Sequence, residues 1–142
     1  RHTRRISDFG GLRKSMPMYA AIFLFTSFAS IGLPGLNGFV GEFMILMGSY
    51  PTFKVLTSVA AFGVVLAAIY MLWAYQRMFN GQLDNDENSV LKDLTSKELV
   101  AVGPLLVLML FIGIYPSFIE SYVVQDVSVI YESISNLIGV SQ

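Results

Sequence analysis

The sequence predicts an all-α membrane protein, on the evidence of three long uncharged runs, a low charge content and one cluster of helix-breaking residues. Of the 142 residues, 54% are hydrophobic and only 13% are charged, whereas a soluble domain usually carries about a quarter charged residues. The uncharged runs cover residues 16–41, 55–76 and 99–119. Each is longer than the roughly 18 apolar residues that indicate a membrane span. Three transmembrane spans are therefore expected.

The first span, residues 16–50, is predicted to be a discontinuous helix. Residues 32–38, Gly-Leu-Pro-Gly-Leu-Asn-Gly, combine glycines with a proline, so the backbone is expected to leave the helix there. Neither flank alone crosses a hydrocarbon core of ~30 Å at about 1.5 Å per residue. One span built from two half-helices and two short spans joined by a tight turn both fit this pattern.

The distribution of basic residues favours the single broken span. With one span, every lysine and arginine except Lys54 falls on the same side of the membrane. This agrees with the positive-inside rule for cytoplasmic loops. Two short spans would move more of the basic residues to the other side. On the preferred topology, residues 1–15 and 79–98 form cytoplasmic loops.

The second and third spans follow from the same pattern. The second span is predicted over residues 52–78, and Trp73 lies towards its inner end, where an aromatic belt belongs. The third span is predicted over residues 99–116. Just before it, Thr95 and Glu98 have the spacing of a capping box, which predicts a helix start at this point.

The C-terminal segment, residues 117–142, is predicted to be an amphipathic helix on the periplasmic side. Its apolar residues recur at helical spacing, for example at Ile119, Val127 and Ile134, with acidic residues between them. Such a helix lies on the membrane surface or against a partner subunit. The absence of a Lys/Arg face favours the partner. With the three spans it makes residues 1–142 a single membrane-domain fragment.

Glu42 is the residue of the predicted spans that we expect to take part in the function. It is the only acid or base between residues 16 and 53, and it lies roughly 12 Å along a helix from the nearer interface at Tyr50. An ionised carboxylate at such a depth costs at least about 2.5–3.5 kcal/mol, so a modest local field decides whether the proton stays. This placement fits a proton relay. The alternative is an ion pair with another segment that serves only assembly.

The breaker cluster supplies the second part of the expected site. Unwound backbone at membrane depth occurs only where it is buried in protein or lines a water-filled cavity. Broken helices of this kind form ion sites in transporters. The residues expected to build the break, or to leave room for water or a neighbouring helix, are Gly32, Pro34, Gly35, Asn37, Gly38 and Gly41. A plain interhelical turn is the alternative for this cluster taken alone.

The composition argues against several other kinds of site. The chain has no cysteine, and its one histidine is His2. A thiolate-held iron–sulfur cluster, a zinc site or a haem site is therefore not expected within it. Nothing in the sequence resembles a nucleophile triad, a phosphate-binding loop or a nucleic-acid patch. No metal, cofactor or redox active site is predicted in this chain.

Residues 32–43, Gly-Leu-Pro-Gly-Leu-Asn-Gly-Phe-Val-Gly-Glu-Phe, closely resemble the C-terminal part of subunit M of bacterial NADH-quinone oxidoreductase, which corresponds to chain 4 of mitochondrial complex I. Other similar motifs recur over residues 1–116. They are Arg-His-Thr-Arg at 1–4, Phe-Gly-Gly-Leu at 9–12, Ala-Tyr-Gln-Arg-Met-Phe-Asn-Gly at 74–81 and Ile-Gly-Ile-Tyr-Pro at 112–116. The tail beyond them is not diagnostic.

The resemblance implies an antiporter-like, proton-pumping subunit of complex I, the respiratory electron-transport translocase, with these spans as its last three. Glu42 would match the buried glutamate of the family's broken helix, in the half-channel towards the outer side. The quinone site, FMN and the iron–sulfur clusters would belong to other subunits. The implied partners are other membrane subunits of complex I, the remainder of the same chain, lipid, protons and water. The implied location is the bacterial inner membrane, as a multi-pass protein.

Two alternatives remain open at this stage. Related subunits of multisubunit cation/proton antiporters and membrane-bound hydrogenases share the broken helix, and several carry lysine at the position of Glu42. Gly-Glu-Phe at 41–43 therefore favours subunit M among these relatives. The other alternative is a purely structural membrane scaffold, in which Glu42 is an assembly contact. The coupling ion, and the subunit through which protons leave, are not determined by this sequence.

Overall fold

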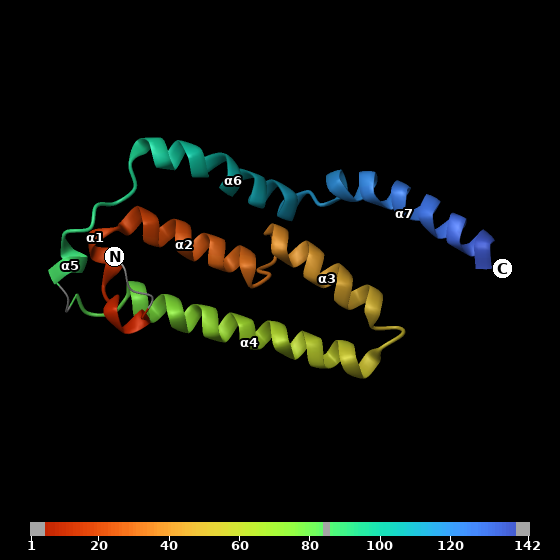
Figure 1. Cartoon of the computed structure of the whole chain (residues 1–142), viewed down its shortest axis with the longest axis horizontal. Helices are drawn as coiled ribbons and strands as arrows, with labels where there is room; N and C mark the ends of the chain where they lie inside the picture. The colour runs from red at the N-terminus through yellow and green to blue at the C-terminus, as the bar shows by residue number, and fades with distance from the viewer. Residues whose placement is uncertain (1–4, 84–85, 139–142) are drawn as a thin grey trace.

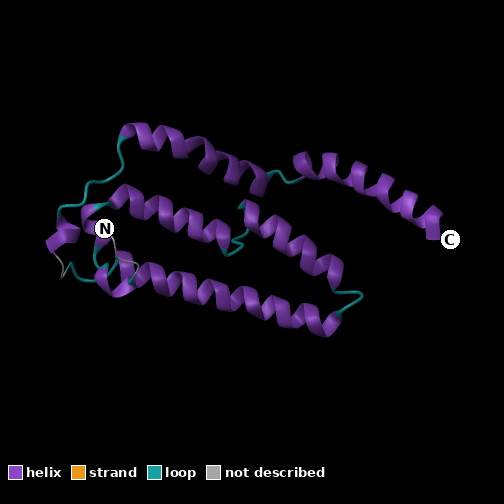
Figure 2. Cartoon of the chain, viewed as in Figure 1, coloured by secondary structure: helices purple, strands orange, loops and turns teal. Residues whose placement is uncertain are grey.

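The computed structural model describes residues 5–83 and 86–138, except the side chains at positions 125, 126, 132 and 135–138. Within these residues the chain is helical and forms no strand (Figure 2). The 3₁₀ helix is η1 (Ile6–Asp8), and the α-helices are α1 (Leu12–Ser15), α2 (Pro17–Ser30), α3 (Asn37–Ser49), α4 (Lys54–Phe79), α5 (Asp86–Ser89), α6 (Ser96–Ile114) and α7 (Ser117–Ile138). The predicted all-α class is confirmed.

Helices α2 and α3 together form one discontinuous span. In Figure 1 they follow one another nearly end to end, and α4 runs back alongside both. Residues 31–36 separate them and have no helical structure. Because the chain keeps its direction through this break, the arrangement is that of a single broken span and not of two spans joined by a tight turn.

Helices α4 and α6 are each long and apolar enough to cross a membrane. Helix α6 begins at Ser96, as the predicted capping box at Thr95 indicated, and so starts before the predicted membrane span at residue 99. The backbone N–H of Thr95 donates to Glu98 Oε2 at 2.8 Å, and the Glu98 N–H donates to Thr95 Oγ1 at 3.5 Å. This reciprocal pair satisfies donors that a helix start otherwise leaves free.

The segments predicted as loops contain short helices. Gly11, directly before α1, has a φ of 65°, a conformation that glycine adopts without strain. Leu12 of α1 is buried with Ala20, Tyr75 and Phe79 in a small core at this end of the bundle. Aromatic rings hold α2 against α4 there. The ring centroids of Phe23 and Phe79 lie 5.0 Å apart, and those of Tyr19 and Phe79 lie 6.0 Å apart.

The first turn of α2 is capped by a residue from a distant part of the chain. Asp93, just before α6, accepts hydrogen bonds from the backbone N–H groups of Met18 at 2.7 Å and Tyr19 at 3.0 Å. Desolvation raises the pKa of the Asp93 carboxyl, but the hydrogen bonds from Met18, Tyr19 and Leu94 hold this pKa below its ordinary value of 3.8. The stability that the ionised cap contributes is therefore present above the ordinary pKa of 3.8, and it is lost as the pH falls through the lowered folded-state pKa.

Helix α7 extends away from the other helices towards the C-terminus (Figure 1). Its described apolar side chains, including Val123, Val127 and Ile130, are exposed. The predicted C-terminal helix is confirmed. The predicted apolar position Leu137 and the acidic positions Asp126 and Glu132 lie outside the described side chains.

Candidate functional site

The break begins with a left-handed residue at the end of α2. Gly32 has a φ of 71°, which allows the chain to turn out of the helix. The Leu33 N–H then reaches back to the Phe28 carbonyl at 3.0 Å, and the Ile31 N–H bonds to the Ser27 carbonyl at 3.0 Å. The first of these bonds is characteristic of the glycine-containing C-cap called the Schellman motif. The predicted role of Gly32 in ending the half-helix therefore has a local explanation.

A type II turn follows at residues 33–36. Leu36 N–H donates to the Leu33 carbonyl at 3.1 Å, with Pro34 and Gly35 at the two central positions. Gly35 has a φ of 93°, and a type II turn requires a positive φ at this position. Pro34, at the position before Gly35, supplies the fixed φ that the turn needs there. The turn then leads directly into α3, whose first residue is Asn37.

Glu42 lies in α3, and its side chain folds back towards the end of α2. A methyl group placed on Gly32 would lie 3.1 Å from Glu42 Cδ and 3.7 Å from Oε1, and Oε2 would be closer still. The side chain is half-buried. Among the described residues it has no hydrogen-bond or ion-pair partner. The structure therefore places the carboxylate at the break itself, in the space that a side chain at position 32 would occupy.

The two half-helices approach each other at Gly38. A methyl group on Gly38 would collide with the Ala29 carbonyl oxygen and lie 3.2 Å from the Ala29 carbonyl carbon. The carbonyl groups of Ala29 and Ser30 accept no backbone hydrogen bond within the described part of the chain. Free carbonyls at a helix C-terminus carry partial negative charge. Carbonyl oxygens and a carboxylate are groups that can bind a proton, water or a cation.

Asn37 is the second polar side chain at the break. Its Oδ1 atom is buried and has no hydrogen-bond partner in the described part of the chain. A buried acceptor of this kind normally binds a donor from water or from another segment. The predicted break residues Gly32, Pro34, Gly35, Asn37 and Gly38 thus lie together in one region. Gly41 is different, because a methyl group there would meet nothing within 4 Å.

Helix α6 closes one side of the break, a contact that sequence reasoning did not predict. A methyl group on Gly113 would collide with the carbonyl group of Gly35 and with Leu36 Cα. Leu36 itself is buried. The only signal in the sequence was that Gly113 lies within an apolar span. A glycine can occur at such a position for many reasons, so it does not by itself predict this contact. The long-range cap by Asp93 was missed for a similar reason, because it joins residues far apart in the chain.

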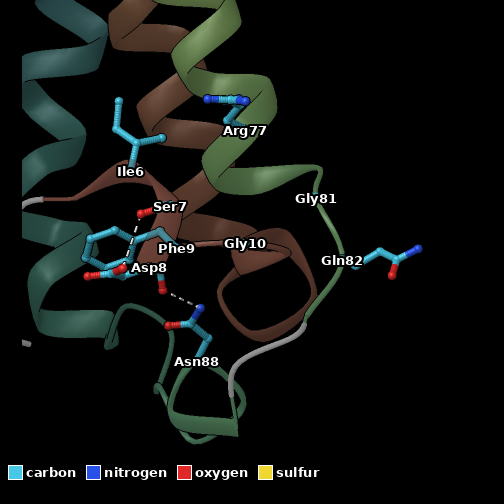
Figure 3. Close-up of a pocket in the computed structure, with 9 residues that line it drawn as sticks. All are labelled: Ile6, Ser7, Asp8, Phe9, Gly10, Arg77, Gly81, Gln82 and Asn88. Atoms are coloured by element: carbon cyan, nitrogen blue, oxygen red, sulfur yellow. Dashed lines mark hydrogen bonds between the residues drawn. The ribbon is translucent and has the colours of Figure 1, made fainter.

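A separate pocket of about 280 Å³ lies away from the break, at the end of the bundle near α1, and is lined by residues of η1, α4, α5 and the segments beside them (Figure 3). Here the segment at Gly10 lies so close to the segment after α4 that a methyl group on Gly10 would be 2.6 Å from the Gln82 carbonyl oxygen. The fully buried Asn88 donates to the Asp8 carbonyl at 3.2 Å. Arg77 stacks on Trp73, 4.5 Å from the ring centroid. Glu42 and the break do not contribute to this pocket.

The contact between Gly32 and Glu42 leads to a prediction with a matched control. Both Gly32 and Gly35 have positive φ, so alanine at either position adds backbone strain of about 1–2 kcal/mol. Only at Gly32 does the new methyl group displace the Glu42 carboxylate, because nothing lies within 4 Å at Gly35. We expect Gly32→Ala to impair ion transport more than Gly35→Ala at equal protein level in the membrane. Equal transport by the two variants would contradict this.

Comparison with known proteins identifies the class of protein. Residues 1–69 match the model of the transmembrane family described as NADH:quinone oxidoreductase/Mrp antiporter. This match includes α2, the break and α3. This part of the chain is therefore similar to a family of antiporter-like membrane proteins, and the chain is a membrane protein.

Two similar proteins are both NADH-quinone oxidoreductase subunit M. The chain is 43% identical to NADH-quinone oxidoreductase subunit M of Rhodobacter capsulatus, over 86% of this chain and 24% of that protein. It is 36% identical to subunit M of Rickettsia bellii, over 96% of this chain and 26% of that protein. The resemblance to subunit M is confirmed, and the chain spans about a quarter of the length of these relatives.

A solved structure shows the same helix arrangement. The chain is similar to a chain of the respiratory complex I from Thermus thermophilus with bound NADH, with a TM-score of 0.71 and 36% identity. The match covers 80% of this chain and 24% of that chain. The TM-score and the identity together show that the two chains share their fold over the matched region.

Proposed function

We propose that the chain is part of the proton-translocating subunit M of an NADH:quinone oxidoreductase, and that Glu42 is its protonatable relay residue. The observation that carries this proposal is the position of the Glu42 carboxylate at the break of a membrane span, against Gly32. The family and the relatives support the setting. The role of Glu42 is our inference from its geometry.

The proposed relay has two states. In one, Glu42 takes up a proton and becomes a neutral carboxyl group, which is the less costly state in low-dielectric surroundings. In the other, it passes the proton on and is left as a carboxylate. The unwound backbone between α2 and α3 gives water access at membrane depth, and the free carbonyls of Ala29 and Ser30 can accept hydrogen bonds from that water.

The exposed apolar surfaces fit a chain that works inside a larger membrane assembly. Within the described residues, α3 and α6 have no buried residue, and most apolar side chains of α4 are exposed. We propose that lipid, the remainder of the subunit and neighbouring subunits of complex I cover these surfaces. The proposed location is the bacterial inner membrane. FMN, the iron–sulfur clusters and the quinone site are proposed to lie in other subunits.

The decisive test is Glu42→Gln in the complete complex. Glutamine keeps the shape of the side chain but cannot carry the proton. We expect the complex to assemble while the number of protons pumped per NADH oxidised falls by about tenfold or more, since acid–base groups commonly contribute on the order of a hundredfold. Glu120→Gln, in α7 beyond the spans, is the control and should pump normally. Pumping in reconstituted vesicles and assembly on native gels are measured together.

The alternatives predict other outcomes of this experiment. A purely structural scaffold predicts that Glu42→Gln loses assembled complex, while any complex that remains pumps normally. Normal assembly together with normal pumping would remove Glu42 from the mechanism. A cation/proton antiporter subunit predicts transport that requires Na⁺ or another metal cation, so the wild-type protein is measured with and without Na⁺.

A further inference from the structure

Each backbone N–H group at the start of α2 has a hydrogen-bond partner. The Met16 N–H bonds to the Leu12 carbonyl, Pro17 has no N–H, and the Ala20 N–H bonds to the Met16 carbonyl. The two donors that remain, on Met18 and Tyr19, both bond to Asp93. No residue next to the helix supplies a side-chain cap. Within the described residues, the Asp93 carboxylate is therefore the side chain that caps the free N–H groups at this helix end.

Helix α2 connects this anchor to the break. Its 14 residues form a continuous helix about 21 Å long at 1.5 Å per residue. At the far end, Gly32 follows directly and lies against the Glu42 carboxylate. A helix is stiff along its axis, so a shift of its start moves its end by a similar amount. The position of Gly32 relative to Glu42 thus depends on how the start of α2 is held.

Among the contacts that hold α2, its ring contacts with α4 and its hydrogen bonds to Asp93 act in different directions. The rings of Tyr19 and Phe23 pack against α4, which fixes the sideways position of the helix. Ring pairs accept several packing geometries, whereas hydrogen bonds to an ionised carboxylate are strong and directional. The hydrogen bonds to Asp93 point along the helix axis, as helix N–H groups do. They therefore set the position of α2 along its length, and the ring contacts keep the helix folded when the cap is removed.

We propose that Asp93 is a positioning residue for the relay at Glu42: its carboxylate fixes the start of α2, and α2 holds Gly32 against the Glu42 carboxylate. This inference rests on the proposed function of Glu42. It adds a residue of the loop between α5 and α6, far from the break in sequence and in space, to the parts that determine how the relay works. Asp93 itself does not touch the transported proton.

The first test compares Asp93→Ala with Asp86→Ala in the complete complex. Asp86 is an exposed acid at the start of α5, in the same connection between α4 and α6, so its loss removes the same charge without uncapping α2. We expect Asp93→Ala to lower protons pumped per NADH oxidised by about tenfold, since a displacement of about 1 Å at a reacting group can cost up to about a hundredfold. Asp86→Ala should pump normally. Asp93→Asn keeps one acceptor oxygen and should restore part of the pumping.

A second measurement reports on Glu42 directly and does not require pumping. A hydrophobic carbodiimide modifies protonated carboxyl groups in membranes, and mass spectrometry of the peptide that contains Glu42 gives its rate of modification. We expect a several-fold change of this rate in Asp93→Ala, partial recovery in Asp93→Asn and no change in Asp86→Ala. A cap that serves stability alone would leave the rate unchanged in the assembled complex. If Asp93→Ala does not assemble, the comparison is made with Asp93→Asn.

The outcomes separate this inference from the function on which it rests. If Glu42→Gln abolishes pumping while Asp93→Ala and Asp93→Asn leave both pumping and the Glu42 modification rate unchanged, the positioning role is wrong and the relay stands. If Glu42→Gln pumps normally, the relay itself is wrong. Equal effects of Asp93→Ala and Asp86→Ala would show that only the charge of the segment matters, which would also overturn the positioning role.

Discussion

Replacement of Gly38 by alanine is expected to separate the two half-helices and to prevent assembly of the complex. The added methyl group would collide with the Ala29 carbonyl oxygen. The methyl group would be fixed to the backbone of α3, and the carbonyl is part of the backbone of α2. A side-chain rotation therefore cannot relieve the clash. One half-helix must move, and overpacking of this kind typically costs about 1–3 kcal/mol or more. We expect electron transfer and pumping to fall together with the amount of assembled complex on native gels.

Gly41→Ala is the matched control for Gly38→Ala. Both glycines lie in α3, but a methyl group on Gly41 meets nothing within 4 Å. Alanine there should stabilise the helix by about 0.5–1 kcal/mol, because glycine is the poorer helix former. Thermal unfolding of the purified complex should therefore be unchanged or slightly higher for Gly41→Ala. An assembled, fully stable Gly38→Ala complex would contradict the close approach of α2 and α3.

Replacement of Gly113 by alanine is expected to have the second large effect, by pushing α6 away from the break. The methyl group would collide with the Gly35 carbonyl group and with Leu36 Cα, which are again backbone atoms. Because Leu36 is buried, the turn cannot move outward without losing that packing. We expect a lower thermal unfolding temperature of the complex, at a cost of about 1–3 kcal/mol, together with reduced pumping.

Gly103→Ala controls for the loss of a glycine in the same helix. Gly103 also lies in α6, and nothing lies within 4 Å of a methyl group placed there. This variant should assemble, pump and unfold as the wild-type protein does. If Gly113→Ala behaved in the same way as Gly103→Ala, the contact between α6 and the turn would have no importance for the site.

Local patterns were sufficient to predict the long helices of this fold, although not the short helices in the connecting segments. Apolar runs of membrane length predicted α4 and α6, and the capping pair at Thr95 and Glu98 predicted where α6 begins. The breaker cluster at residues 32–38 predicted the interruption between α2 and α3. These features depend on residues within a few positions of one another, so backbone geometry and hydrophobicity determine them without any distant contact.

The sequence by itself determined that an acid, Glu42, lies in a membrane span close to a stretch that cannot remain helical. Only the tertiary structure decided which groups meet there. It brought the Glu42 carboxylate back to Gly32, placed Gly113 against the turn, and joined Asp93 to the start of α2. The reason is physical: these contacts join segments on different helices, and their distances depend on how the helices pack, which no local pattern of residues specifies.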